Sequence, residues 1–178
     1  MDIESGRFVV FDLETTGLDV NRDFIIEIGA AKIENGEIGE RFSSFVSYPA
    51  HLPEDIKELT GIADGDLKDA PPIEDVLVRF KNFARGCTLV AHNLGFDFAI
   101  LRNWGFWCVT STCDTDFDPF AEDAIDTLAL SKKVLGGAVK NYKLHTLADY
   151  FGIPFEPHRA LGDAVETAEV FLKHAARG

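Results

Sequence analysis

Apolar residues in the first part of the chain form short, nearly continuous runs, a pattern typical of strands buried on both faces. Residues 7–14 form one run, and residues 24–34 form a second that ends at Asn35 and Gly36. Because an Asn-Gly pair tolerates the positive φ of a two-residue hairpin turn, residues 39–48 are predicted to return as the antiparallel partner strand. The chain is therefore predicted to open with three successive strands.

Helical spacing replaces these runs further along the chain. Apolar residues within 73–84 recur on one helix face, and a stripe that begins at about Ala160 is wide enough to pack on a sheet. Residues 103–120 show no clean period and are predicted to be an irregular insertion that could include one short strand. The other elements predicted are a strand over 87–92 and helices over 53–59, from 96 through 101, over 123–134 and over 144–151. This order predicts an α/β fold, a mixed sheet with helices packed against it.

Composition places the chain in one class of protein. A chain of 178 residues with 46% hydrophobic residues can bury a single core, so one domain over residues 1–178 is expected. No apolar run approaches the roughly 18 residues of a membrane span, and the acidic N-terminus does not resemble a signal peptide. A soluble, cytoplasmic protein without a membrane partner is expected. Three cysteines with no paired spacing favour ordinary reduced thiols over disulfides or a zinc site.

The net charge of −13 argues against binding along a long polyanion, which requires many contacts from Lys and Arg. It leaves open a protein that holds only the end of a nucleic acid through metal ions. Residues 127–148 contain no acid, and they include Lys132, Lys133, Lys140 and Lys143. Such a cationic patch could lie beside a phosphate backbone or could be a solvated surface turn, and charge alone leaves both open.

Two carboxylates stand at the end of the first predicted strand. Asp12 and Glu14 are two residues apart, so their side chains project from the same face, with Cα atoms roughly 6.5 to 7 Å apart. Buried carboxylates cost several kcal/mol each unless the lost hydration is replaced, and a divalent cation can replace it. The alternative is that the strand has reached solvent and the two acids form a polar edge. This stretch alone does not decide between them.

Two further acids stand at comparable places. Asp97 is predicted in the first helical turn after strand 87–92, and Asp163 in the first turn of the last helix, with His158 in the loop before it. An acid in a first turn is often only a favourable charge on the helix dipole. Taken together, however, four acids at element ends, with one histidine beside the last, would suit two cations.

At this point the chain resembles the DEDD superfamily of 3′ to 5′ exonucleases. The stretches that carry the resemblance are "FDLETTGL", "AHNLGFDFAIL" and "HRALGDA", in the family's order, and the last has the histidine of the DEDDh branch. Within the family the chain is most similar to the epsilon proofreading subunit of bacterial DNA polymerase III and to related exonuclease domains of replicative polymerases. The resemblance implies a ribonuclease H-like fold with a five-stranded mixed sheet. It also implies two Mg²⁺ or Mn²⁺ ions held by Asp12, Glu14, Asp97 and Asp163, with His158 as general base.

The resemblance also indicates how the terminal nucleotide is held. The turn Thr15, Thr16, Gly17 and Leu18 is expected to contact its sugar and base, with Gly17 allowing a ligand close to the backbone. The other substrate-binding residues expected are Ile62, Asn93 and Phe96. Phe96 could stack on a base, although a Phe in the core is a competing interpretation. Of the other histidines, His92 is expected to support the site, His145 to lie on a helix, and His51 and His174 to lie among surface residues.

The function expected is metal-dependent removal of nucleoside 5′-monophosphates from single-stranded DNA 3′ ends, as in proofreading beside a DNA polymerase catalytic subunit. One alternative is an RNA-trimming exonuclease, because the same constellation can hydrolyse either backbone. Another is a non-catalytic module that binds nucleic-acid ends, although such a module would not need a base beside the metals. An EF-hand is excluded because Pro119 and Ile125 stand where Gly and Glu are required. A glycosidase would leave two of the four acids without a role.

Overall fold

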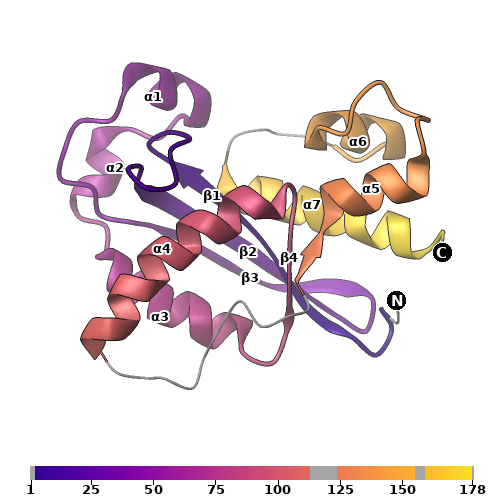
Figure 1. Ribbon diagram of the computed structural model, residues 1–178, viewed down its shortest axis with the longest axis horizontal. Coiled ribbons are helices and arrows are strands. Elements are labelled where there is room, and N and C mark those ends of the chain that lie inside the picture. The colour runs from indigo at the N-terminus through magenta and orange to yellow at the C-terminus, as the bar shows by residue number, and fades with distance from the viewer. Residues whose placement is uncertain (1–2, 113–123, 155–158, 178) are drawn as a thin grey trace.

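The protein contains a five-stranded mixed sheet with the strand order β3-β2-β1-β4-β5 (Figure 1). The computed structural model describes residues 3–112, 124–154 and 159–177. The first three strands pair antiparallel, whereas β4 and β5 join β1 in parallel. Their bounds are β1 (Arg7–Thr15), β2 (Ile25–Glu34), β3 (Glu37–Phe45), β4 (Thr88–Ala91) and β5 (Ile125–Asp126). The predicted α/β class and mixed sheet are confirmed.

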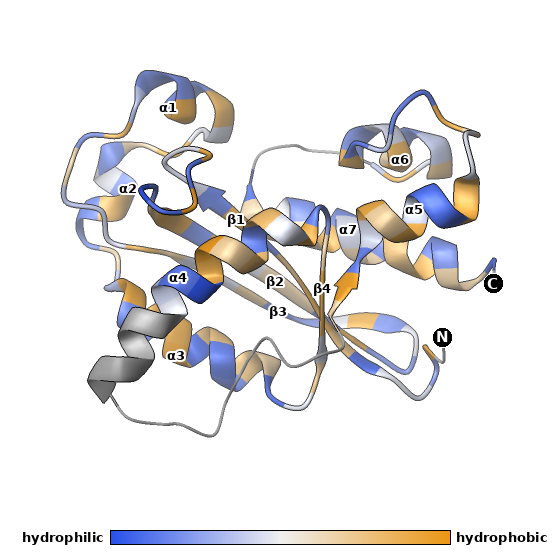
Figure 2. Ribbon diagram, viewed as in Figure 1, coloured by the Kyte–Doolittle hydropathy of each residue, from blue (hydrophilic) through white to orange (hydrophobic). Residues whose placement is uncertain are grey.

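Helices cover both faces of this sheet. Buried side chains of α3 and α4 pack on one face of β1, and those of α7 pack on the other. In Figure 2, α3 carries alternating orange and blue residues, as expected for a helix with one face on the sheet and one in solvent. The helices among the described residues are α1 (Glu54–Thr60), α2 (Asp64–Lys68), α3 (Ile73–Ala84), α4 (Leu94–Thr112), α5 (Thr127–Leu135), α6 (Leu144–Phe151) and α7 (Ala160–Ala175).

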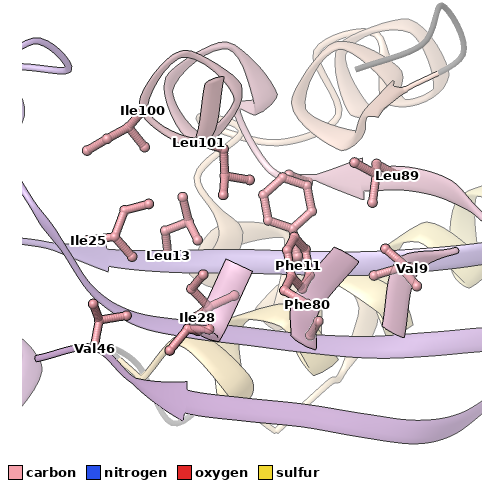
Figure 3. Packing of buried hydrophobic residues seen from close by; sticks show 14 residues of the cluster. Val9, Phe11, Leu13, Ile25, Ile28, Val46, Phe80, Leu89, Ile100 and Leu101 are labelled. Carbon is pink, nitrogen blue, oxygen red and sulfur yellow. The ribbon is translucent and has the colours of Figure 1, made fainter. Parts of the chain in front are cut away.

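Strand β1 divides the core into two layers. Its residues Phe11 and Leu13 point into the cluster formed with α3 and α4, where Phe11 lies 5.6 Å from Phe80 between ring centroids (Figure 3). Phe8 and Val10 alternate with them and belong to the cluster that contains Phe171 of α7. Since side chains alternate along a strand, the next residues on the face of α7 are Asp12 and Glu14. The apolar stripe under α7 therefore ends in two acids.

The direction of α7 brings its N-terminus to those acids. Phe8 near the start of β1 packs edge-on against Phe171 near the end of α7, with ring centroids 5.2 Å apart. The helix thus runs back along the strand, and its first turn lies at the carboxyl end of β1. Contacts of α7 with both β1 and β2 hold it in this orientation.

Helix α4 corrects one prediction. It runs from Leu94 to Thr112, through much of the stretch that was expected to be irregular, and the rest of that stretch, residues 113–120, lies outside the described residues. Apolar residues occur on all sides of this helix, so no helical period marked it in the sequence. Trp104 on α4 donates its indole N–H to the carbonyl oxygen of Asp23 at 3.3 Å, and its ring lies 5.0 Å from that of Phe24. It therefore anchors the loop after β1.

Other differences concern short or buried features. The two-residue strand β5 and the five-residue helix α2 were missed because so few residues carry no period, and Asp126 ends β5 and caps α5 where continuous helix was predicted. His174 was expected among surface residues but is 2% exposed, and its Nε2 lies 2.7 Å from the hydroxyl of Ser131. Within the described part of the chain, every helix is too short or too polar to cross a membrane.

Candidate active site

Three carboxylates gather at the carboxyl end of β1. One oxygen from each of Asp12, Glu14 and Asp163 lies within 4.8 Å of the others. The first two come from alternate positions of β1, and the third comes from the first turn of α7. The fold thus brings these three acids together, although Asp163 is far from the other two in the sequence.

The packing of α7 on β2 explains how Asp163 reaches the strand. Gly29 is paired with Asp12 across the two strands, and a Cβ atom added to Gly29 would lie 2.1 Å from the carbonyl carbon of Ala160. Only glycine allows the helix to start this close to the sheet. The backbone N–H of Asp163 donates to the carbonyl oxygen of Arg159 at 3.0 Å, which forms the first turn of the helix.

Asp97 lies nearby but outside this group of three oxygens. It is in the first turn of α4, which follows β4, and β4 runs parallel to β1. Both carboxyl ends consequently meet at one edge of the sheet, and Asp97 is only 4% exposed there. Its charge is the largest of the neighbouring charges that raise the pKa of Asp12.

Burial and mutual repulsion raise the pKa of these acids. Burial raises the pKa of Asp12 well above its usual range, and the charges of Asp97, Asp163 and Glu14 raise it further. The pKa of Glu14 is raised to about 8 by burial and by Asp163 and Glu27, against a lowering by Arg159. Burial raises the pKa of Asp97 to about 8, its own backbone N–H opposes the rise, and Asp126 adds to it. The cluster therefore favours either protons or a cation.

These residues fit a hard divalent cation. Carboxylate oxygens are the ligands that Mg²⁺ and Mn²⁺ prefer, and a cation would relieve the repulsion that raises the pKa of each acid. A polar edge in solvent, the alternative left open for Asp12 and Glu14, would not bury Glu14 to 9% exposure. The chemistry of the donor set thus agrees with a metal site.

One buried acid beside the cluster was missed in the sequence. Glu27 on β2 is paired with Glu14 across the strands and is 1% exposed. Its carboxylate accepts hydrogen bonds from Arg159 Nε at 3.1 Å, from Arg159 Nη2 at 3.0 Å and from the backbone N–H of Ala160 at 3.2 Å. An acid inside the apolar run "IIEIGAA" was the available signal, since a buried charge requires a partner.

The turn after β1 is held by its own side chains. Thr15 donates its hydroxyl to the carbonyl oxygen of Gly17 at 2.6 Å, and Thr16 donates to Asp23 Oδ1 at 2.9 Å. A Cβ atom on Gly17 would lie 2.5 Å from Asp23 Oδ2, so the carboxylate of Asp23 leaves room only for glycine at this position. Leu18, the next residue, is 85% exposed. The turn is therefore held by side-chain hydrogen bonds and exposes the apolar side chain of Leu18 to solvent.

The other predicted substrate-binding residues differ in exposure. Ile62 is 1% exposed and packs with Ile26, Leu52 and Leu67 in a small core beneath α1 and α2. Asn93 is exposed in a left-handed conformation, φ 66°, and its backbone N–H donates to Asp126 Oδ1 at 3.2 Å. Phe96 is half-buried in the first turn of α4. Asn93 and Phe96 thus lie beside Asp97, whereas Ile62 belongs to the core.

The histidines named in the sequence analysis differ in their surroundings. His92 contacts the hydroxyl of Thr127 through Nδ1 and the carbonyl oxygen of Tyr142 through Nε2, both at 2.9 Å, which agrees with a supporting role. His51 is exposed beside Asp64, and His145 lies on α6. His158 lies outside the described residues, between Pro154 and Arg159, so its role stays a prediction.

Comparison with known families gives one match over most of the chain. The model of the family RNase_T, described as "Exonuclease", matches residues 9–171. A relative named DNA polymerase III PolC-type from Caldanaerobacter subterraneus subsp. tengcongensis is 44% identical over 169 residues, which is 94% of this chain and 11% of the relative. Its namesake from Thermotoga maritima is 40% identical over 170 residues, 94% of this chain and 12% of the relative. The chain thus spans about an eighth of such relatives or less.

Solved structures share the fold at low identity. Exonuclease I of E. coli in complex with a dT13 oligonucleotide superimposes with a TM-score of 0.79 at 16% identity, covering 97% of this chain and 42% of that one. Exonuclease X in complex with 5′ overhanging duplex DNA gives a TM-score of 0.71 at 24% identity, covering 95% of this chain and 91% of that one. The likeness agrees with the ribonuclease H-like sheet expected from the sequence.

Proposed function

The chain belongs to the RNase_T exonuclease family, and from this premise we propose that it is a metal-dependent 3′ to 5′ exonuclease acting on single-stranded DNA. It would release nucleoside 5′-monophosphates one at a time from the 3′ end. The observation that carries the proposal is the convergence of Asp12, Glu14 and Asp163 within 4.8 Å of one another at the carboxyl end of β1.

Two Mg²⁺ or Mn²⁺ ions are proposed as cofactors, held by Asp12, Glu14, Asp97 and Asp163. The raised pKa values of Asp12, Glu14 and Asp97 support this ligand set, because each reports a carboxylate that lacks compensation for its buried charge. When bound, a pair of such ions supplies charge stabilisation to both the attacking and the leaving oxygen of an in-line displacement at phosphorus. The protein contributes the fixed carboxylates and a rigid frame around them.

His158 is proposed to take the proton from the attacking water. Its ordinary pKa lies near neutrality, so it can accept a proton at physiological pH and lose it again before the next cycle. It directly precedes Arg159, whose guanidinium is tied to Glu27. The chain next to the proposed base is therefore fixed to the sheet on the side of α7.

The terminal nucleotide is proposed to lie between the turn after β1 and the start of α4. Thr15, Thr16, Gly17 and Leu18 form one side, and the exposed side chain of Leu18 can pack against a sugar or base. Asn93 and Phe96 form the other side. A Phe that stacks on a base contributes about 1 to 3 kcal/mol without reading its sequence. Ile62 is too buried to touch the nucleotide directly, so we propose that it supports the pocket from the core.

Single-stranded DNA and a DNA polymerase catalytic subunit are the proposed partners. Support for the polymerase comes from relatives named DNA polymerase III PolC-type, of which this chain resembles a segment. Support for DNA comes from the names of solved structures of similar fold, which contain an oligonucleotide or duplex DNA. Proofreading during replication, in the cytoplasm, is the role that unites these partners.

Digestion of end-labelled oligomers tests this function. Single-stranded DNA and RNA of one sequence, labelled at the 5′ or the 3′ end, would be incubated with Mg²⁺, with Mn²⁺ or with EDTA. Metal-dependent shortening from the 3′ end that is faster on DNA supports the proposal, whereas faster shortening of RNA would assign the chain to RNA trimming. Binding without digestion in either metal would overturn the enzymatic role and indicate a module that only binds nucleic-acid ends.

A further inference from the structure

Glu27 occupies an unusual position for a charged side chain. It lies near the start of β2 and pairs with Glu14 near the end of β1, it is 1% exposed, and it faces the same side as the metal-ligand cluster. A buried carboxylate is costly unless it is paired and hydrogen-bonded, and a second acid beside Glu14 increases the repulsion at the cluster. An apolar residue at this position would avoid both costs. The contacts of Glu27 indicate what compensates for them.

Among the described residues, the hydrogen bonds to the Glu27 carboxylate come from the start of α7. Arg159 donates to both of its oxygens at 3.0 and 3.1 Å, and the backbone N–H of Ala160 donates to Oε2 at 3.2 Å. Arg159 provides no side-chain cap for α7, so the acid from β2 supplies an acceptor that the helix N-terminus lacks locally. The guanidinium also lies over the ring of Phe45 on β3, 5.2 Å from its centroid.

The first turn of the same helix carries Asp163. Its backbone N–H donates to the carbonyl oxygen of Arg159, so a shift of Arg159 and Ala160 would move Asp163 with them. Gly29 allows the backbone of Ala160 to lie directly against β2. Because glycine has no side chain, Gly29 itself cannot hold the helix at one place along the strand. Glu27, two residues from Gly29, is the β2 side chain that accepts hydrogen bonds from Arg159 and Ala160.

We propose that Glu27 is a positioning residue that holds the N-terminus of α7, and thereby keeps Asp163 within metal-binding distance of Asp12 and Glu14. This inference rests on the proposed metal-dependent function, but it concerns how the ligand cluster is assembled. Residues that orient metal ligands from outside typically change metal affinity or activity by roughly 10- to 100-fold when substituted.

Metal affinity without DNA gives the sharpest test, because positioning and simple charge predict different patterns. Glu27→Gln removes a negative charge and Arg159→Gln removes a positive one. If the two residues acted on the cluster only through space, Glu27→Gln would weaken Mn²⁺ binding and Arg159→Gln would strengthen it. If they position α7, both substitutions weaken it, by roughly 10-fold or more. The double variant, which restores the net charge, would then stay weak.

The measurement is a titration of the whole chain with Mn²⁺ alone, followed by calorimetry or by the loss of free-ion electron paramagnetic resonance signal. Glu34→Gln is the matched control, since Glu34 also lies on β2 and also pairs with an arginine, Arg7, but is exposed and far from the cluster. Thermal unfolding in EDTA shows which variants are folded. Glu27→Asp, which keeps the charge, should recover part of the affinity in a folded protein.

Tighter Mn²⁺ binding by Arg159→Gln, or recovery in the double variant, would overturn positioning in favour of charge. Unchanged Mn²⁺ affinity in Glu27→Gln would overturn any role of Glu27 at the cluster. Both results are independent of nuclease activity. If the wild-type chain binds Mn²⁺ but digests no nucleic acid, the proposed function fails while the positioning inference is still decided by the affinities.

Discussion

Gly29 of β2 lies directly against Ala160 at the start of α7, so close that a Cβ atom on Gly29 would be 2.1 Å from the carbonyl carbon of Ala160. Gly29→Ala should therefore push the first turn of α7, and Asp163 with it, away from β1. Overpacking of this kind destabilises a protein by about 1 to 3 kcal/mol. We expect that loss in the free energy of unfolding, together with a weaker affinity for Mn²⁺.

Chemical denaturation and Mn²⁺ titration would measure the two effects in Gly29→Ala. Gly39→Ala is the matched control, because Gly39 lies on the neighbouring strand β3 and has no atom within 4 Å of an added Cβ. That control should retain wild-type stability to within about 0.5 kcal/mol. Wild-type metal affinity in a folded Gly29→Ala variant would show that the close contact does not set the position of Asp163.

The acidic cluster should make the metal-free protein less stable as the pH rises. The folded pKa of Glu14 is about 8 against an ordinary value of 4.5, so between these values the folded state binds more protons than the unfolded state. The free energy of unfolding in EDTA should therefore fall across this window, by on the order of a few kcal/mol for the group. Thermal unfolding at pH 5, 6.5 and 8 measures this slope.

Saturating Mn²⁺ should reverse that trend, because metal binding needs the deprotonated carboxylates and its affinity rises with pH. Glu14→Gln, which removes one of the three acids with a raised pKa, should reduce the slope in EDTA. A stability that rises from pH 5 to pH 8 in EDTA in the wild-type protein, by an amount that Glu14→Gln removes, would contradict the raised pKa of Glu14.

Asp12 and His158 are expected to have separable roles. Asp12→Asn should abolish digestion and Mn²⁺ binding, yet stabilise the metal-free protein at pH 8, because it removes a buried acid that repels its neighbours. His158→Ala should lower the turnover rate and leave Mn²⁺ affinity intact. Rates, affinities and thermal unfolding in EDTA would be compared, with the exposed Asp149→Asn as control. Equal loss of metal affinity in both variants would show that His158 is a ligand rather than a base.

The cationic loop between α5 and α6 should help to hold the DNA strand. The carbonyl oxygen of Tyr142 contacts His92, which follows β4 at the carboxyl end of the sheet, so the exposed Lys140 and Lys143 lie on a loop tied to the end that carries the acids. Lys140→Glu and Lys143→Glu should each raise KM for an oligonucleotide with little change in kcat. Each should also reduce the slope of log affinity against log salt by about 0.7, the value per contact for single strands.

Lys173→Glu is the control for this surface. Lys173 is also exposed, but it lies near Phe171, at the end of α7 that packs on the start of β1. Its substitution should leave KM and the salt slope unchanged. Equal effects of all three substitutions would mean that the lysines act only through net charge and that the loop forms no path for the strand.

The sequence predicted those helices and strands whose packing requires apolar residues at regular intervals. The bounds of α3 and α6 agree with the predicted ones, because apolar residues recur on one face of each. Strand β1 was readable because both of its faces are buried, which leaves a continuous apolar run. The start of α4 was predicted, but its continuation beyond Leu101 was missed because that stretch shows no helical period. The two residues of β5 were missed because they are too few to show any pattern.

The candidate site was also predicted only in part. The alternation of a strand placed Asp12 and Glu14 on one face, and the first turns of two helices placed Asp97 and Asp163 near strand ends. What the sequence could not show is the tertiary contact that joins them, which depends on Gly29 and on Glu27. The carboxylate of Asp23 lies against Gly17 where a Cβ atom would stand, a contact that the sequence did not indicate.

The most direct test of the central claim is the identity of the first product released from an unlabelled single-stranded DNA in Mn²⁺, measured by mass spectrometry. In-line attack on the terminal phosphodiester with departure of the 3′ oxygen predicts the nucleoside 5′-monophosphate of the 3′-terminal residue, formed by the wild-type chain and absent with Asp163→Asn. Release of the 5′-terminal nucleotide, of a nucleoside 3′-monophosphate, or of equal product from Asp163→Asn would contradict the account.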